Sequence, residues 1–248
     1  MELKEHERID DLQYKGLKII QNIKSFCFGI DAVLLSDFAK DMKKNEKIVD
    51  LCTGTGVIAI LLAGKTNARE IIGVEIQEEF ADMAKRSIEM NSLQDRVKII
   101  NKDLNKLKSY IPSATVDAVT VNPPYIKKGS GIINEKDSKV IARHEISCTL
   151  DDVIRESSRL LNFNGTLYMV HKAERLVDIF CLMRKYKIEP KRIRFIHPRF
   201  NEPANLVMIE GSKSGGSFLI HEKPLYIYED KEEYTDEIYK IYNMEKNK

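Results

Sequence analysis

The residues that most clearly suggest chemistry are four in succession, Asn122, Pro123, Pro124 and Tyr125. They follow an apolar run at 118–121 that reads as a buried parallel strand, so they stand at a strand's carboxyl end, where open α/β sheets bind ligands. The side-chain carbonyl of Asn122 and the backbone carbonyl of Pro123 can each accept one N–H of a planar amino group, which aims the nitrogen lone pair at a methyl donor. The ring of Tyr125 offers a face for a flat base. The alternative is an ordinary turn, since Asn-Pro and Pro-Pro punctuate many chains.

A second candidate site is the glycine-containing segment at 50–57, between the first strand and the first helix of the predicted sheet. Its glycines let the backbone turn tightly and approach a ligand. Acids follow the next two strands, Glu75 positioned to accept hydrogen bonds from ribose hydroxyls and Asp103 to meet an adenine amino group. The third glycine of the dinucleotide fingerprint is missing, which favours S-adenosylmethionine over a nicotinamide cofactor. The predicted cofactor-binding residues are Asp31, Asp50, Thr53, Gly54, Gly56, Glu75, Ile76, Asp103, Leu104 and Asn122. Taken singly, each acid can instead be a cap, a surface charge or a turn residue.

The elements that must position these residues alternate between strand and helix. Apolar runs at 48–51, 71–75, 97–100, 118–121 and 166–170 predict strands, and 56–63, 79–91 and 150–161 have helical patterns. Such alternation predicts a parallel sheet covered on both faces. Runs at 192–197, 206–209 and 218–220 lie close together and predict an antiparallel edge.

We therefore expect one domain over residues 1–248, with an N-terminal lid or helical segment at 1–45, an α/β core at 46–222 and a C-terminal tail at 223–248. In the first of these, Asp31 stands where a helix N-cap belongs. A role for segment 26–31 as a lid over the cofactor is a further hypothesis.

Composition excludes several classes of protein. Hydrophobic residues make up 43% and charged residues 31%, the net charge is only +2, and no apolar run approaches membrane-spanning length. The four cysteines are widely separated, which argues against a disulfide framework and a zinc site. We expect a soluble, cytoplasmic protein without metal and without membrane contact. The oligomeric state does not follow from the sequence, and a monomer is the working expectation.

These motifs make the chain resemble the class I S-adenosylmethionine-dependent methyltransferases that carry the N-P-P-Y motif. It is more narrowly similar to the bacterial tRNA1(Val) adenine-N6 methyltransferase family, through segments 28–35, 50–56, 122–125, 142–145, 197–199 and 210–211. The resemblance implies a Rossmann-like, seven-stranded, mostly parallel sheet with helices on both faces and an antiparallel edge. It also implies S-adenosylmethionine as cofactor and methylation of the adenosine beside the anticodon of a valine tRNA.

Carried onto this chain, the resemblance makes Asn122, Pro123 and Tyr125 the catalytic residues. The predicted RNA contacts are Tyr125, Lys127, Lys128, Arg143, His144 and Arg199, with Lys136 and Lys139 as further phosphate contacts. The basic run at 184–199 is either part of that RNA surface or a solvated face. Alternative substrates are DNA adenine, guanine N2 of ribosomal RNA and a protein glutamine. An RNA-binding module without activity and a nicotinamide-dependent oxidoreductase are the alternatives from other classes.

Overall fold

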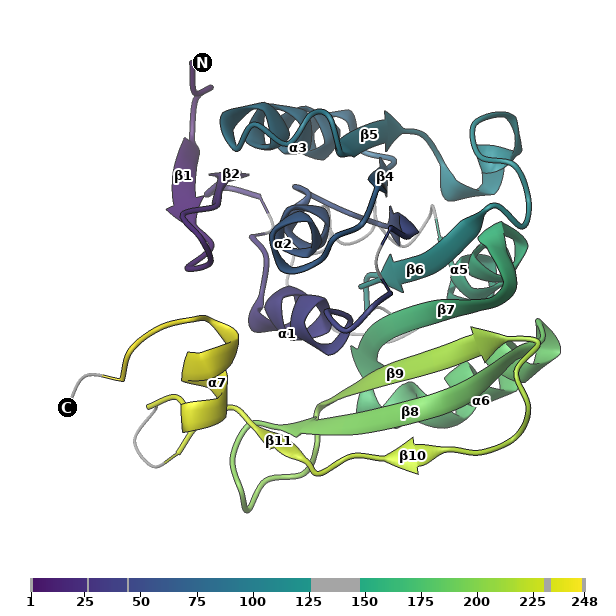
Figure 1. Cartoon of the computed structure of the whole chain (residues 1–248). Coiled ribbons are helices and arrows are strands. Elements are labelled where there is room, and N and C mark those ends of the chain that lie inside the picture. The colour runs from purple at the N-terminus through teal and green to yellow at the C-terminus, as the bar shows by residue number, and fades with distance from the viewer. Residues whose placement is uncertain (1, 26, 44, 126–147, 230–232, 247–248) are drawn as a thin grey trace.

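The protein is described from a computed structural model that covers residues 2–25, 27–43, 45–125, 148–229 and 233–246. Its centre is a nine-stranded sheet in the order β10-β8-β9-β7-β6-β3-β4-β5, with β11 also paired to β8 (Figure 1). The strands of this sheet are β3 (Lys47–Leu51), β4 (Glu70–Glu75), β5 (Val97–Asn101), β6 (Val116–Val121), β7 (Leu161–Lys172), β8 (Ile188–His197), β9 (Leu206–Lys213), β10 (Ile220–His221) and β11 (Leu225–Tyr226).

Strands β3 to β7 run parallel, and β9 inserts antiparallel between β7 and β8. The predicted parallel core with an antiparallel edge is therefore confirmed. Seven strands form the sheet that the sequence predicts, and the short β10 and β11 extend it by pairing in parallel with β8, so the run predicted at 218–220 does not continue the antiparallel edge.

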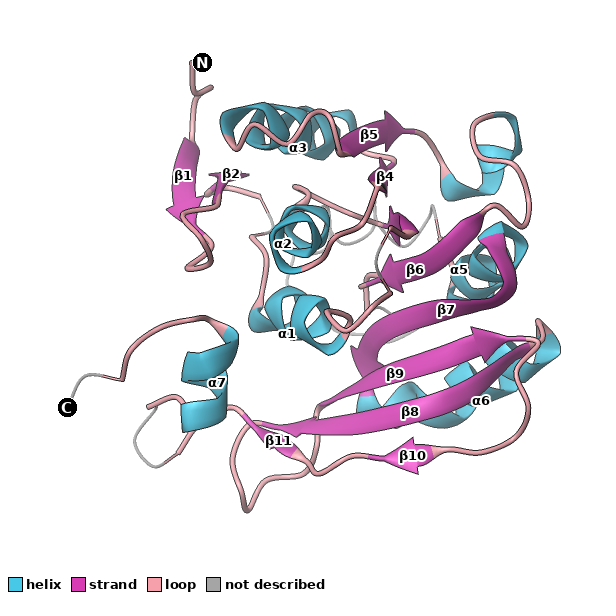
Figure 2. Ribbon diagram, viewed as in Figure 1, coloured by secondary structure: helices cyan, strands magenta, loops and turns pink. Residues whose placement is uncertain are grey.

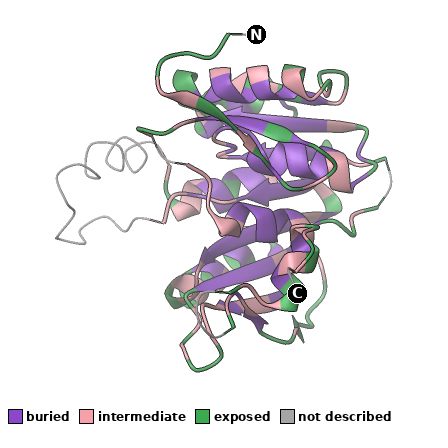
Figure 3. Cartoon of the chain, turned by 90° about the vertical axis from the view of Figure 1, so that its left-hand side faces the viewer, coloured by how far each residue is buried: buried purple, intermediate pink, exposed green. Residues whose placement is uncertain are grey.

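Helices cover both faces of the sheet, as Figure 2 shows. One face carries α1 (Ile30–Phe38), α2 (Val57–Lys65), α3 (Glu78–Met90) and α7 (Asp236–Ile241), and the other carries α5 (Leu150–Leu160), α6 (Leu176–Lys185) and the 3₁₀ turn η1 (Leu104–Ser109). A second 3₁₀ turn, η2 (Ala173–Arg175), joins β7 to α6. Successive side chains of a strand point to opposite faces, so Ile48 packs in the first layer and Val49 in the second. The buried residues accordingly fill the strands and the inner sides of the helices (Figure 3).

The N-terminal segment is an antiparallel hairpin, β1 (Glu7–Asp11) with β2 (Lys18–Asn22), that lies apart from the main sheet. The sequence predicts a lid or helical segment over residues 1–45, and the structure has this hairpin there, followed by helix α1. The hairpin packs on α3, where Ile20 is fully buried against Phe80 and Met83 and its backbone N–H donates to Ser87 Oγ at 2.9 Å. The backbone of Phe28 donates to Gln21 Oε1 at 2.9 Å, which ties the entry of α1 to the hairpin.

Helix α1 begins before Asp31, the residue that the sequence predicts as its N-cap. Gly29 is the N-cap residue, with an extended backbone, and Asp31 lies inside the first turn. The prediction that Asp31 caps the helix is therefore wrong. Its carboxylate accepts a hydrogen bond from the next backbone N–H through Oδ1, and its other oxygen is directed elsewhere, at residues of another loop.

Candidate active site

The loops that follow β3, β4 and β6 meet at one edge of the sheet. Leu51 at the end of β3 pairs with Val74 of β4 on one side and with Val121 of β6 on the other. Because the three strands are parallel and in register, the glycine loop, Glu75 and the N-P-P-Y segment are necessarily neighbours. The sequence predicts these segments at this edge, and the structure brings them together.

Between these loops lies a cavity of about 310 Å³. Its walls come from Phe28, Gly29, Asp31 and Ala32 at the start of α1, Cys52, Thr53, Gly54, Thr55, Val57 and Ile58 at the glycine loop, Glu75, Phe80, and all four residues of 122–125. A smaller cavity of about 30 Å³ shares Cys52, Glu75 and Pro124 with it and adds Ile76, Asp103 and Leu104. Most of the predicted cofactor residues thus line one or the other of these two neighbouring cavities, and the exceptions are Asp50 and Gly56.

The glycine loop has the backbone that a ligand cradle requires. Gly54 adopts φ +57° and Gly56 φ +89°, both in the left-handed region. A Cβ added to Gly54 would meet nothing within 4 Å, because that position opens into the cavity, whereas one on Gly56 would lie 3.2 Å from Ala84 Cβ. Cys52, at the start of the loop, also has a positive φ of +57°. Gly54 therefore leaves room for a ligand, and Gly56 leaves room for α3.

Asp50, near the end of β3, is fully buried and lines neither cavity. Thr53 donates to one oxygen of its carboxyl group at 2.5 Å and Thr120 to the other at 2.7 Å. Burial raises the pKa of Asp50 to about 7, against the opposing effect of the two hydroxyl donors. Among the described contacts, its hydrogen bonds serve to tie the loop to β6.

Glu75 is almost fully buried and faces both cavities. Its two oxygens accept from the backbone N–H groups of Gly54 and Gln77, each at 2.9 Å. Since each carboxylate oxygen has a second lone pair, both can still accept from hydroxyl groups of a ligand. Asp103 caps η1 by accepting from the backbone of Asn105 at 2.9 Å, so its turn role and its position on the cavity wall coexist.

The motif side chains form a hydrogen-bonded triad with Asp31. Asn122 donates from Nδ2 to Asp31 Oδ2 at 3.0 Å, and the hydroxyl of Tyr125 lies 2.7 Å from the same oxygen. That hydroxyl also lies 2.6 Å from Asn122 Oδ1. A phenol has one proton, so it donates to only one of the two acceptors at a time. The Asp31 carboxylate fixes the amide nitrogen as the donor and leaves the amide oxygen as the acceptor on the motif side.

The aromatic ring of Tyr125 is held in place from the side of β7. His171 contacts it edge-on at 5.3 Å between centroids, and Lys172 Nζ lies 5.6 Å from its centroid. Burial, and then the Asp31 carboxylate, raise the pKa of Tyr125 well above its usual value. Burial likewise lowers the pKa of His171 to about 4, so the imidazole is neutral at neutral pH. Tyr125 is therefore a neutral ring and hydroxyl at the cavity wall.

Several predicted substrate contacts lie outside the described residues: Lys127, Lys128, Lys136, Lys139, Arg143 and His144. Arg199 is described, and it stands apart from the cavity, at the carboxyl end of β8. Its guanidinium pairs with Glu202 at 3.0 Å and lies 5.4 Å from the Tyr228 ring.

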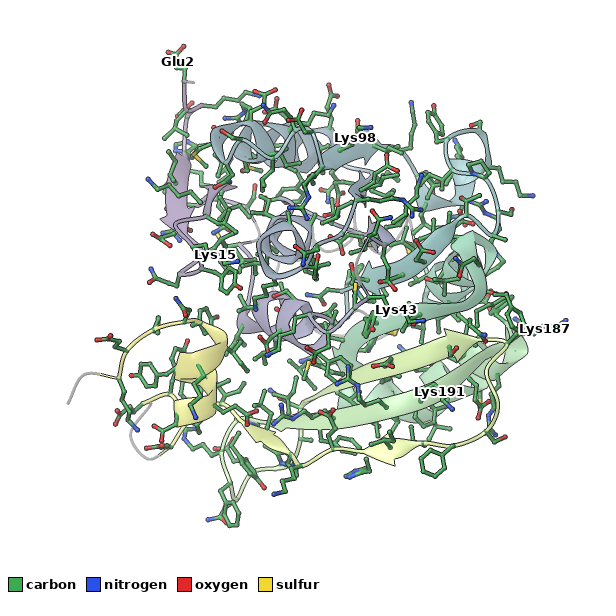
Figure 4. All side chains as sticks on the ribbon, in the orientation of Figure 1. Glu2, Lys15, Lys43, Lys98, Lys187 and Lys191 are labelled. Carbon is green, nitrogen blue, oxygen red and sulfur yellow. The ribbon has the colours of Figure 1, made fainter. Side chains whose placement is uncertain are left out.

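The basic run at 184–199 is largely engaged within the protein. Besides Arg199, four of its cations pair with carboxylates: Arg184 with Glu189, Lys185 with Asp151, Arg192 with Glu210 and Glu222, and Arg194 with Glu237. Lys187 is exposed at the turn before β8, and Figure 4 shows it at the periphery of the molecule. Most cations of the run therefore form ion pairs within the protein, which agrees better with a solvated surface face than with an RNA-binding surface.

Three features of the site could not be predicted from the sequence. Phe80 has the pattern of a core residue, yet it also lines the cavity. Phe28 lines the cavity too, but it belongs to segment 26–31, for which the sequence already suggests a role near the cofactor. Lys172 follows an apolar strand with no motif around it, and only the sheet register places it beside Tyr125. The link from Asp31 to Asn122 spans 91 positions, and no local pattern announces it.

Comparison with known proteins adds independent findings. Residues 29–185 match the family model described as "Methyltransferase small domain". A Porphyromonas gingivalis protein named tRNA1(Val) (adenine(37)-N6)-methyltransferase is 28% identical over 189 residues, which cover 74% of this chain and 73% of that protein. A Pedobacter heparinus protein of the same name is 27% identical over 231 residues, 92% of this chain and 94% of the relative.

Among solved structures, an Agrobacterium tumefaciens protein described as a predicted O-methyltransferase is similar in fold. It matches with a TM-score of 0.69 at 22% identity, over 86% of this chain and 95% of that one. This similarity agrees with the class of fold that the sequence predicts.

Proposed function

The chain belongs to the methyltransferase small domain family, and on that premise we propose that it methylates the N6 amino group of an adenine in the anticodon loop of a valine tRNA. Methyl transfer and S-adenosylmethionine as the donor are the part of the predicted function that family membership supports directly. The kind of amino group, the base and the RNA are the proposed part.

One observation carries the proposal: the N-P-P-Y segment and the cofactor-type loop line the same cavity. Gly54 opens that cavity to a ligand, and Glu75 presents buried carboxylate oxygens to it. When bound, S-adenosylmethionine supplies a methyl group on a positively charged sulfur. A donor site and a set of amino-group acceptors in one cavity are what N-methylation requires.

The acceptors act by orientation and by electrostatics. An exocyclic amine is a poor nucleophile because its lone pair is delocalised into the ring. Asn122 Oδ1 and the Pro123 carbonyl each accept one N–H, which turns the lone pair out of the ring and matches the positive charge that develops on nitrogen. An amide does not take up a full proton, so the chain's own residues stabilise the transition state and leave the released proton to solvent.

The substrate must displace one contact of the triad. Asn122 Oδ1 lies 2.6 Å from the Tyr125 hydroxyl, whereas Asp31 Oδ2 lies 2.7 Å from the same hydroxyl. The phenol proton can therefore go to Asp31 and free the amide oxygen for the substrate, with no movement of Asn122. The aromatic ring of Tyr125 borders the cavity, where a flat base extruded from its loop can contact it.

The choice of tRNA is supported by the relatives. Two proteins that bear the name tRNA1(Val) (adenine(37)-N6)-methyltransferase match this chain over 73% and 94% of their own lengths. A base in an anticodon loop is poorly paired, so its extrusion costs only about a few kcal/mol.

The test is methyl transfer from labelled S-adenosylmethionine to separated RNA, DNA and protein fractions, followed by nucleoside and amino acid analysis. We expect label in tRNA, as N6-methyladenosine, from a valine transcript and not from a transcript with the loop adenosine changed to guanosine. Label in N2-methylguanosine, in DNA or in glutamine would replace the proposed substrate and keep the enzyme class. RNA binding without any binding of S-adenosylmethionine, measured by calorimetry, would identify an RNA-binding module without activity instead.

A further inference from the structure

A group of half-buried aromatic and basic side chains around one exposed ring lies at the carboxyl end of β8, at the same edge of the sheet as the cavity. We call it the edge patch, and its residues are His197, Arg199, Phe200, Tyr226 and Tyr228. Phe200 is 75% exposed, in the loop between β8 and β9. A phenylalanine so open to water contributes little to folding, so its place on the surface calls for another explanation.

The rings of the edge patch already contact one another. Phe200 and Tyr226 have centroids 5.4 Å apart with a tilt of 51°, and His197 lies 5.3 Å from Tyr226. The Arg199 guanidinium lies 5.4 Å from the centre of the Tyr228 ring. Tyr226 sits in β11, which pairs with β8 at His197, so the sheet holds the inner rings and Phe200 is left at the rim.

The sheet register connects this surface to the cavity. Lys172 at the end of β7 pairs with Leu206 of β9, and Leu206 pairs with Ile196 of β8. Neighbouring strands are about 4.8 Å apart, so His197 lies on the order of 10 Å from Lys172. Lys172 Nζ in turn lies 5.6 Å from the ring of Tyr125. A cation thus stands between the proposed base site and the edge patch.

Arg199 is the cation of the edge patch that can hold a phosphate. The side chains of Arg199 and Glu202 are 41% and 42% exposed. Exposed ion pairs contribute little to stability, so a phosphate can replace Glu202 as the partner of Arg199. The acids of the neighbouring tail, Glu229, Glu233 and Asp236, all contact Lys246 Nζ within 3.7 Å, which offsets part of their charge.

We propose that the edge patch binds an unpaired nucleotide of the RNA substrate, with its base stacked on Phe200 and its phosphate held by Arg199 and Lys172. This inference rests on the proposed RNA substrate and adds a second contact beyond the modified base. Stacking on exposed aromatic rings, together with arginine, is a general mode of binding single-stranded RNA.

The experiment compares Phe200→Ala with Phe163→Ala. Phe163 is also 75% exposed but lies near the start of β7, which pairs with the start of β6, at the opposite edge of the sheet. The probe is a fluorescein-labelled RNA hairpin with the anticodon stem and loop of a valine tRNA, and the readouts are its Kd by anisotropy, the KM and kcat for methylation, and the affinity for S-adenosylmethionine by calorimetry.

We expect Phe200→Ala to raise the Kd for the hairpin roughly 5- to 100-fold. Phe163→Ala should change it by less than about twofold. The affinity for S-adenosylmethionine should be unchanged in both variants. Phe200→Tyr should bind the hairpin about as well as the wild type, whereas Phe200→Leu should not.

The outcomes separate the two proposals. If the wild type binds and methylates the hairpin and Phe200→Ala binds it equally well, the edge patch is overturned and the function stands. If the wild type binds the donor but no RNA, the RNA substrate is wrong and the edge patch falls with it. If Phe200→Ala changes only the sedimentation of the protein, the patch is a contact between two copies, which also overturns the inference.

Discussion

At the scale of single residues, the reactivity of the site depends on which atom of Asn122 faces the substrate. An amide presents a donor and an acceptor that differ little in shape, and only its surroundings select between them. Here Asp31 Oδ2 accepts from the nitrogen at 3.0 Å, so the oxygen is kept for the incoming amine. Asp31 is thus a positioning residue, and its position depends on Gly29, where a Cβ would come within 2.7 Å of its carboxylate.

Replacement of Asn122 by alanine removes one of the two proposed amine acceptors. We expect kcat to fall by roughly 10²- to 10³-fold, or about 3–4 kcal/mol of transition-state stabilisation, with nearly unchanged affinity for S-adenosylmethionine. Single-turnover kinetics and calorimetry measure the two quantities. A variant with wild-type turnover would rule out the proposed role of the amide.

Replacement of Asp31 by alanine leaves Asn122 in place but removes what orients it. A hydrogen bond to a charged group is worth about 1.5–3 kcal/mol, so we expect kcat to fall roughly 10- to 100-fold while KM for RNA stays nearly constant. Asp31→Asn should recover part of the rate, because its side-chain oxygen can still accept from Asn122 Nδ2. The matched control is Asp41→Ala, an exposed acid just beyond α1. Equal losses in Asp31→Ala and Asp31→Asn would show that charge, rather than orientation, matters.

At the scale of elements, two glycines have different roles in the loop between β3 and α2. Both have positive φ, but Gly54 borders the cavity and Gly56 borders α3 at Ala84. The loop is anchored through Asp50 to β6 and through the Gly54 N–H to Glu75. Its shape is therefore set by the strands on either side, before any ligand is present.

Gly54→Ala should weaken donor binding more than it weakens the fold. The new Cβ enters the space for the ligand, and the left-handed backbone adds about 1 kcal/mol of strain. Gly56→Ala carries similar backbone strain and in addition presses on Ala84, so its free energy of unfolding should fall further. Calorimetry with the donor and urea denaturation separate the two effects. The division of roles is wrong if Gly56→Ala loses more donor affinity at equal stability.

Sequence patterns foresee the elements whose local signal and tertiary role agree. The apolar runs at 48–51, 71–75 and 97–100 correspond to β3, β4 and β5, and the helix predicted at 79–91 is α3. The hairpin is missed because β1, with the sequence ERIDD, has a single apolar residue and takes its stability from α3. Likewise Phe218 and Leu219, which read as a strand, precede the two-residue β10 and remain exposed.

The candidate site, too, could be predicted from the sequence only in part. Its loops follow from the rule that parallel strands bring their carboxyl ends together, whereas the partner of Asp31 depends on how α1 packs against the sheet. An acid that caps a helix and an acid that holds side chains of another loop look alike in sequence, because both stand near the start of a helix. Only the arrangement in space distinguishes them.

At the scale of the whole molecule, stability should depend on pH through Asp50. Its folded pKa of about 7 lies above its ordinary value of 3.8, so between these pH values the folded state keeps a proton that the unfolded state has released. Stability from this group therefore falls as pH rises through that window and is constant above it. The lowered pKa of His171 acts in the opposite direction, between about 4 and 6.5, because there the unfolded state binds the proton.

The contribution of Asp50 can be isolated by subtraction. We expect the free energy of unfolding of the wild type, relative to Asp50→Asn, to decrease from pH 4 to pH 7, because the asparagine has no proton to lose. Urea denaturation of both proteins at steps of pH measures the difference. A difference that is independent of pH would contradict the raised pKa.

The first hairpin and the last helix contribute none of the described residues that line the larger cavity, yet each supports one of its walls. The hairpin holds Phe80 through Ile20 and the Phe28 backbone through Gln21, while α7 packs Ile238 and Ile241 into the layer that contains α1, the helix of Asp31. Affinity tags, fusions or trimming at either end are consequently not neutral choices for an assay. Low activity in a shortened protein would then reflect weaker support of the cavity walls, because all the proposed catalytic residues would still be present.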